Sequence, residues 1–232
     1  MVQGMIGAVQ GVLFFKESPW HVIPLWGWLT MLIVGLVVGP LFAFRGVNNK
    51  LKAFLGARPK IKVIKKENVL GDVISRRGNT IVSQEHPHFT RIHIANDPEV
   101  ATEGSEAKKV VGHISFYTDG DGQCLFEMIG RWAETREIAS GGQPIEIEQI
   151  ELPPNARPFI MDIGLKYKDE DEFYLYNNET PRKNTRGFRD TDRALPIGKY
   201  LVKVDFRGTN VSQSFKFTLN NPGKGKGVLL DG

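Results

Sequence analysis

In the stretch Lys199–Arg207, KYLVKVDFR, every second residue from Tyr200 to Phe206 is apolar, and all the residues between them except Leu201 are charged. Its apolar side chains would lie on one face of an extended chain, because successive side chains of a β-strand point to opposite sides. Residues 214–219, SFKFTL, repeat the alternation shortly afterwards. The two segments therefore predict a pair of antiparallel strands, each with one buried and one solvent-facing side.

The same alternation recurs towards the N-terminus as far as residue 89. It occupies residues 90–96, 108–118, 123–132 and 158–167 and, in shorter form, residues 145–152 and 172–176. Clusters of Gly, Pro, Asn and Asp separate these segments, as turns require. No amphipathic helix pattern of ten or more residues follows Gly56. We therefore predict a mainly β fold for residues 89–221, an Ig-like or fibronectin-like antiparallel β-sandwich, with a small barrel as the alternative.

A long apolar stretch precedes the β region. Residues 22–44, VIPLWGWLTMLIVGLVVGPLFAF, include no charged side chain. At a helical rise of about 1.5 Å per residue they extend roughly 34 Å, which exceeds a hydrocarbon core of about 30 Å and predicts a transmembrane helix. Gly35 and Gly39 are four residues apart, a spacing that lets two helix backbones approach closely. They are our predicted helix-packing positions, although glycine is also common in membrane spans without this role.

Basic residues cluster directly after the apolar stretch. Residues 45–66 carry no acid, whereas the residues that follow carry 21 basic and 25 acidic side chains. A Lys/Arg-rich flank is typically cytoplasmic and attracts anionic lipid headgroups. We predict a single-pass protein of the cell membrane with a cytoplasmic C-terminal domain and no nucleic-acid partner, because that domain is net acidic. The predicted membrane-surface residues are Arg45, Lys50, Lys52, Arg58, Lys60, Lys62, Lys65 and Lys66.

The chain accordingly divides into five predicted parts. Residues 1–21 form an apolar N-terminal segment, interfacial or re-entrant, because its first 15 residues are too short to span; a two-span hairpin is the alternative. Residues 22–44 are the transmembrane helix and residues 45–88 a basic juxtamembrane segment and linker. Residues 89–221 are the β domain. Residues 222–232 are a flexible tail, whose GKGKG sequence has no helix or strand predicted after it and is therefore not expected to be a phosphate loop.

No segment carries a motif for catalysis or metal binding. The sequence has neither G-x-S-x-G nor H-E-x-x-H. His86 and His88 are two residues apart, but no carboxylate follows at ligand spacing, which favours surface histidines over a metal site. Cys124 is expected on the apolar face of its strand as inert packing, and Trp132 in the core. We predict no enzymatic activity, no catalytic residue, no metal and no cofactor.

A charged loop of about twenty residues is predicted between two strands, beginning at an acidic run. The acidic run 169–172 is followed by a basic stretch, and the loop is unusually long for a connection between strands. Its length and charge favour a loop that binds a protein partner, and a solvated loop held open by self-repulsion is the alternative. The predicted partner-binding residues are Arg182, Lys183, Arg186, Arg189 and Arg193.

Several short motifs of the β region resemble a recurrent, functionally uncharacterised kind of prokaryotic membrane-anchored Ig-like domain. These are an opening strand that ends in Asn (91–96), GRWAE (130–134), a proline turn (152–155), YNNE (176–179) and PIGKYLV (196–202). The resemblance covers more than half of the chain. It implies an Ig-like fold and no particular activity.

The predicted function is that of a non-enzymatic single-pass membrane protein. Its β-sandwich would bind a protein partner or stabilise a membrane complex. The alternative is an envelope protein whose external β-sandwich is an adhesion or solute-binding module. This alternative would require the helix to insert in the orientation opposite to the one that its basic flank favours.

Overall fold

A computed structural model describes residues 25–77, 80–135, 147–183 and 186–232 of the chain. The N-terminal segment 1–21 lies outside these residues. The chain forms two compact units that divide between Lys52 and Ala53.

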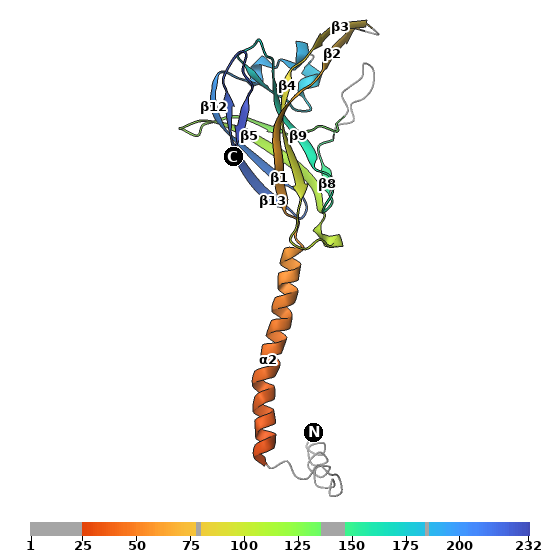
Figure 1. Cartoon of the computed structure of the whole chain (residues 1–232), viewed down its shortest axis with the longest axis vertical. Coiled ribbons are helices and arrows are strands. Elements are labelled where there is room, and N and C mark those ends of the chain that lie inside the picture. Colours follow the sequence, from red (N-terminus) through yellow and green to blue (C-terminus); the bar gives the residue numbers. More distant parts are fainter. Residues whose placement is uncertain (1–24, 78–79, 136–146, 184–185) are drawn as a thin grey trace. The chain divides into compact units, whose positions relative to one another are not determined.

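The first described element is one long helix, α2, at Leu25–Gly56 (Figure 1). Residues 29–56 are long and apolar enough to cross a membrane, by length and composition. The helix continues past the predicted limit at residue 44, because Leu, Lys and Ala between residues 50 and 55 are good helix formers. At Gly35 and Gly39 an added Cβ would meet no atom within 4 Å, so both positions offer room for a close helix contact.

The second unit is built almost entirely of antiparallel strands. Three short 3-10 helices occupy Thr180–Lys183, Arg186–Phe188 and Thr191–Arg193, and another lies at Glu103–Ser105. The strands are β1 (Ile61–Leu70), β2 (Val73–Arg77), β3 (Thr80–Glu85), β4 (His88–Asn96), β5 (Ala107–Thr118), β6 (Cys124–Ile129), β7 (Arg131–Trp132), β8 (Ile150–Leu152), β9 (Phe159–Lys166), β10 (Phe173–Leu175), β11 (Ala194–Leu195), β12 (Gly198–Arg207), β13 (Ser212–Asn221) and β14 (Leu229–Asp231).

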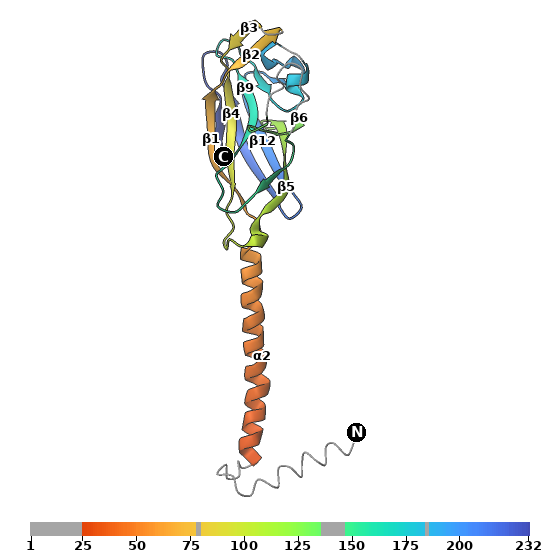
Figure 2. The ribbon, with the colours of Figure 1, turned by 90° about the vertical axis from the view of Figure 1, so that its right-hand side faces the viewer.

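These strands form two six-stranded sheets and a separate β2–β3 hairpin (Figures 1 and 2). The first sheet has the order β1-β4-β9-β10-β11, with β7 also paired to β9. The second has the order β14-β13-β12-β5-β6, with β8 also paired to β5. Both sheets contribute to one hydrophobic core, in which Ile92 and Met161 of the first sheet and Phe116 and Phe206 of the second are fully buried.

The predicted mainly β, antiparallel architecture is confirmed. β12 pairs with β13 from Gly198↔Asn221 to Arg207↔Ser212, as the alternation in both segments predicts. Trp132 is fully buried, with its ring stacked on that of Phe206. Apolar alternation identifies these strands because each has one face in the core.

Four strands occur where the sequence predicts a linker and a flexible tail: β1, β2 and β3 in the linker, and β14 in the tail. β1 lies within residues 45–88 and pairs with β4 along its whole length. Its three lysines and a register shift between Val63 and Lys65 hide the alternation. β14 follows the GKGKG segment and pairs with β13, which ties down the region expected to be flexible.

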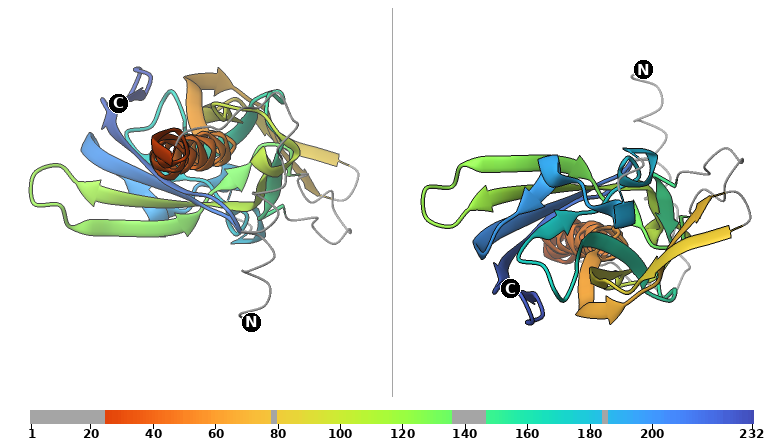
Figure 3. Two further views of the ribbon diagram at one scale, coloured as in Figure 1. Left: turned by 90° about the horizontal axis from the view of Figure 1, so that it is seen from below. Right: turned by 90° about the horizontal axis from the view of Figure 1, so that it is seen from above.

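Cys124 is exposed, and the prediction of an apolar packing role is wrong. Phe116 pairs with Phe126, but the next residue, Tyr117, pairs with Cys124. Leu125 is therefore an extra residue, a bulge that changes the face on which Cys124 lies. The hairpin that carries it, β5–β6 with its tip at residues 119–122, projects beyond the neighbouring strands (Figures 1 and 3).

Candidate functional site

The eight predicted membrane-surface residues divide between two kinds of structure. Arg45, Lys50 and Lys52 lie on α2, and the Arg58 guanidinium lies over the Phe54 ring, 5.5 Å from its centroid. The remaining four lie at or on β1.

The β1 lysines make contacts within the β domain. Lys60 Nζ lies 3.4 Å from Glu99 Oε1, and Lys62 pairs with Asp97. Lys65 pairs with Glu67, while Lys66 donates to the Gly232 carbonyl at 2.7 Å. These four side chains are therefore less available for lipid than their sequence positions imply.

The predicted partner-binding loop is folded around its own ion pairs. Arg189 Nε lies 2.6 Å from Glu170 Oε1, and its Nη1 pairs with Glu85. The same guanidinium stacks on Tyr167, 3.6 Å from the ring centroid. Burial raises the pKa of Tyr167, so its hydroxyl stays protonated and donates to the Gly187 carbonyl. Arg189 thus fastens the loop to the ends of β3 and β9.

Two other loop cations are paired in the same way. Lys183 Nζ lies 2.7 Å from Asp190 Oδ2, and Arg193 lies 2.9 Å from Glu179 Oε2. The side chains of Arg182 and Arg186 lie outside the described part of the chain. Of the five predicted partner-binding residues, the three whose side chains are described are therefore all engaged in ion pairs.

A better candidate surface runs along β6, the edge strand of the second sheet. Gly130 N–H donates to the Gly112 carbonyl, and hydrogen bonding alternates along an antiparallel strand. The N–H groups of Phe126 and Met128 therefore face β5, whereas those of Glu127 and Ile129 face away from the sheet. Within the described residues, no strand pairs with this outer edge.

A polar groove of about 670 Å³ lies beside the β6 edge. Residues of the first sheet's loops face it from across the groove, and outward-facing residues of β5 and β12 extend it. Its lining includes Glu127 and Ile129 on β6, Asn177, Asn178, Glu179 and Arg193 opposite, and His113, Ser115, Tyr117, Lys203, Asp205 and Arg207 on β5 and β12.

The side of the groove opposite β6 is held in place by buried polar contacts. Arg131, which is 4% exposed, donates to Asn178 Oδ1 and to the Thr135 carbonyl, both at 3.0 Å. Its guanidinium also lies 5.1 Å from the centre of the Tyr176 ring. The amide oxygen of Asn178 is thus oriented by a residue that is itself fixed.

The charges that extend the groove are mixed in sign. Lys203 Nζ lies 2.7 Å from Asp205 Oδ2, and this hydrogen bond lowers the pKa of Asp205 below its ordinary value. Asp205 is also the cross-strand neighbour of His113. Neutral amides and paired charges suit the polar main chain of a peptide better than a strongly charged ligand.

The described residues offer no metal centre. No group of three or more His, Cys, Asp or Glu side chains in that part of the chain is arranged to hold a metal ion. His86 Nδ1 instead lies 2.6 Å from Asp72 Oδ1, and His93 Nε2 lies 2.6 Å from Glu67 Oε1.

The sequence analysis did not identify the β6 edge. The available signal was its composition, CLFEMI, in which Glu127 is the only charge. Comparison with protein-family models, curated proteins and solved structures finds no match to this chain.

Proposed function

We propose that this chain is a non-enzymatic, single-pass membrane protein that binds a protein partner through the outer edge of β6, with which no described strand pairs. α2 is the span, and the β domain is an Ig-like sandwich on the cytoplasmic side. The sandwich is supported by two six-stranded sheets that share one core. The cytoplasmic side is supported by Arg45, Lys50, Lys52 and Arg58, which follow the apolar part of α2.

The observation that carries the proposal is the outer edge of β6. An uncovered apolar edge strand invites pairing with another chain, and proteins usually protect such edges with charges, prolines or covering loops. β6 carries one charge and no proline, and Ile129 is exposed. An extended segment of a partner would pair with the outward N–H groups and place alternate side chains in the groove.

A proline substitution tests the main-chain pairing. Glu127→Pro removes an outward N–H that makes no bond to β5, and an edge strand tolerates this change. Glu127→Ala removes the same side chain but keeps the N–H, so it is the matched control. Met128→Pro would break the bond to β5 and serves as the unfolded reference.

Cys124 supplies the means of detecting the partner. It is the only cysteine of the chain, it is exposed, and it begins β6. The full chain, labelled there with a thiol-reactive photocrosslinker in cells, should yield one discrete crosslinked protein. Glu127→Pro should reduce that product about two- to tenfold, whereas Glu127→Ala should not. Equal crosslinking of the Pro and Ala variants would contradict the proposal.

The same thiol tests the orientation. A membrane-impermeant maleimide should label Cys124 only after the membrane of cells expressing the full chain is opened. Partial desolvation of the exposed thiol and the nearby Glu127 raise the pKa of Cys124, so labelling is carried out at mildly alkaline pH. Labelling of intact cells would place the domain outside and favour the adhesion or solute-binding alternative.

A further inference from the structure

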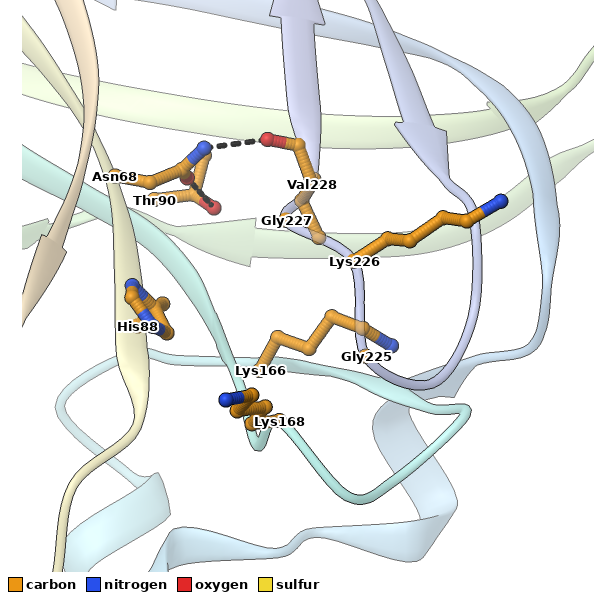
Figure 4. A pocket seen from close by; sticks show the side chains of 9 residues that line it. All are labelled: Asn68, His88, Thr90, Lys166, Lys168, Gly225, Lys226, Gly227 and Val228. Carbon is orange, nitrogen blue, oxygen red and sulfur yellow. Dashed lines mark hydrogen bonds between the residues drawn. The ribbon is translucent and has the colours of Figure 1, made fainter.

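A second pocket, separate from the β6 groove, lies where β4, the end of β9 and the GKGKG segment meet (Figure 4). Its volume is about 200 Å³, which is room for one tetrahedral oxyanion with some water. Lysine and histidine occur among the lining residues, and no acidic residue does. The lining residues are Asn68, His88, Thr90, Lys166, Lys168, Gly225, Lys226, Gly227 and Val228.

The unusual member of this set is Lys166, which is 2% exposed. Its Nζ donates to the carbonyls of Glu170 and Asp171, both at 3.0 Å. No ion pair joins it to a carboxylate among the described residues. Carbonyl groups supply hydrogen bonds to this ammonium but no negative charge. Its positive charge is therefore costly to bury unless an anion binds beside it. Burial accordingly lowers the pKa of Lys166, although acidic residues nearby oppose the shift.

The GKGKG segment is fixed in place beside this lysine. Gly225 N–H donates to the Lys168 carbonyl at 2.7 Å, and Lys224 N–H donates to Asp171 Oδ1 at 2.9 Å. Asn68, which accepts a hydrogen bond from Thr90, donates to the Val228 carbonyl (Figure 4). The segment is therefore a formed wall of the pocket.

The donors around the pocket match an oxyanion. Lys166 has one N–H left after its two carbonyl bonds, because an ammonium carries three donors. Lys168 adds a second ammonium, and Figure 4 shows Lys166 extending from β9 towards Gly225. The main-chain N–H groups of Lys226 and Gly227 make no described bond within the chain. Glycine-rich turns with free N–H groups and nearby lysines are common surroundings for phosphate.

We propose that this pocket binds a phosphate group through Lys166, Lys168 and the main chain of the GKGKG segment. A soluble phosphorylated molecule and the headgroup of an anionic phospholipid both supply this chemistry. The bound anion pairs with the Lys166 ammonium, for which the described residues supply no carboxylate partner.

Lysine acylation of the full chain in a non-ionic detergent tests the proposal. The probes are inorganic phosphate and a short-chain phosphatidic acid, each compared with chloride at equal ionic strength, with acylation of each lysine read by mass spectrometry. We expect saturable protection of Lys168 by at least one probe. Lys224 belongs to the same segment but does not line the pocket, so it is the internal control and should stay reactive.

Variants give the quantitative test. Lys168→Ala should weaken binding of the effective probe at least about tenfold, and Lys224→Ala should leave it unchanged. Lys168 is exposed, so its loss should not disturb folding, unlike substitution of the buried Lys166. Protection by inorganic phosphate supports a soluble phosphorylated ligand, and protection by phosphatidic acid alone supports a lipid headgroup. Equal protection of Lys168 and Lys224, or protection by neither probe, overturns the proposal.

Discussion

Replacing Trp132 with alanine should remove most of the stability of the β domain. Its side chain is fully buried, stacks on Phe206 at 6.3 Å between ring centroids, and donates from Nε1 to the Glu148 carbonyl at 3.2 Å. A buried tryptophan withdraws about 200 Å² from water, equivalent to about 5 kcal/mol at 25 cal/mol per Å². This figure is an upper value, because the unfolded chain already buries part of the ring and the alanine side chain still buries some surface. We therefore expect the free energy of unfolding to fall by about 3–5 kcal/mol.

Trp132→Phe should cost less, about 1–2 kcal/mol, because the ring stacking survives while the hydrogen bond and part of the volume are lost. Ile64→Ala is the control, since Ile64 is 54% exposed and should change stability by less than about 0.5 kcal/mol. Pulse proteolysis of the full chain in urea and mild detergent, followed through a C-terminal tag, measures all three. A loss below about 1 kcal/mol for Trp132→Ala would refute the assignment of this residue to the core.

The same assay checks three further substitutions. Gly164→Ala should cost about 1–3 kcal/mol, because its Cβ would lie 2.6 Å from a main-chain oxygen of β10, whereas at Gly104 the nearest atom is 3.9 Å away and alanine should be tolerated. A hydrogen bond from Lys65 lowers the pKa of Glu67 below 4.5, so the stability that ionised Glu67 contributes is complete above pH 4.5 and is lost as the pH falls through the folded-state pKa. The loss of stability caused by Glu67→Gln should therefore shrink over that acidic range. A loss of stability that does not depend on pH would contradict this prediction. Arg189→Met should lower the stability of the domain by about 2–4 kcal/mol, because two partly buried carboxylates lose their cation. Arg189→Lys keeps the charge and should lower the stability less. Equal losses for the two variants would show that the charge of Arg189 does not stabilise the loop.

The strands that the sequence predicts are those with one face in the core. β12 lies inside its sheet, and burial alternates along it from Tyr200 to Phe206, because a one-residue slip would expose every apolar side chain. β9 also lies inside its sheet, but it is buried continuously from Met161 to Lys166, so only its sequence and not its burial shows a partial alternation. β1 was not predicted, since an edge strand tolerates lysines and a bulge that hide the period. β14 is three residues long, and its pairing with β13 depends on the turn that precedes it rather than on its own pattern.

Both candidate sites depend on pairings that local sequence does not specify. The β6 groove is lined by both Glu127 and Asn178, which lie about fifty positions apart in the chain. The phosphate pocket brings Asn68 beside Val228, which are 160 residues apart. Local sequence also failed to predict the position of Cys124, because a single bulge residue places this side chain on the other face of its strand. Residue types suggested the chemistry, but strand order decided which residues meet.

The basic run 45–66 serves two predicted roles that depend on different residues. Orientation follows the number of Lys and Arg near the span, and acidic residues contribute little to it. All eight cations therefore count towards a cytoplasmic domain, including those on β1. Binding of anionic headgroups requires charges that remain available after folding, and Lys62 and Lys65 then pair with Asp97 and Glu67. Loss of these two lysines should thus weaken the bias in orientation more than the attraction to lipid, which should depend chiefly on the cations of α2 and on Arg58.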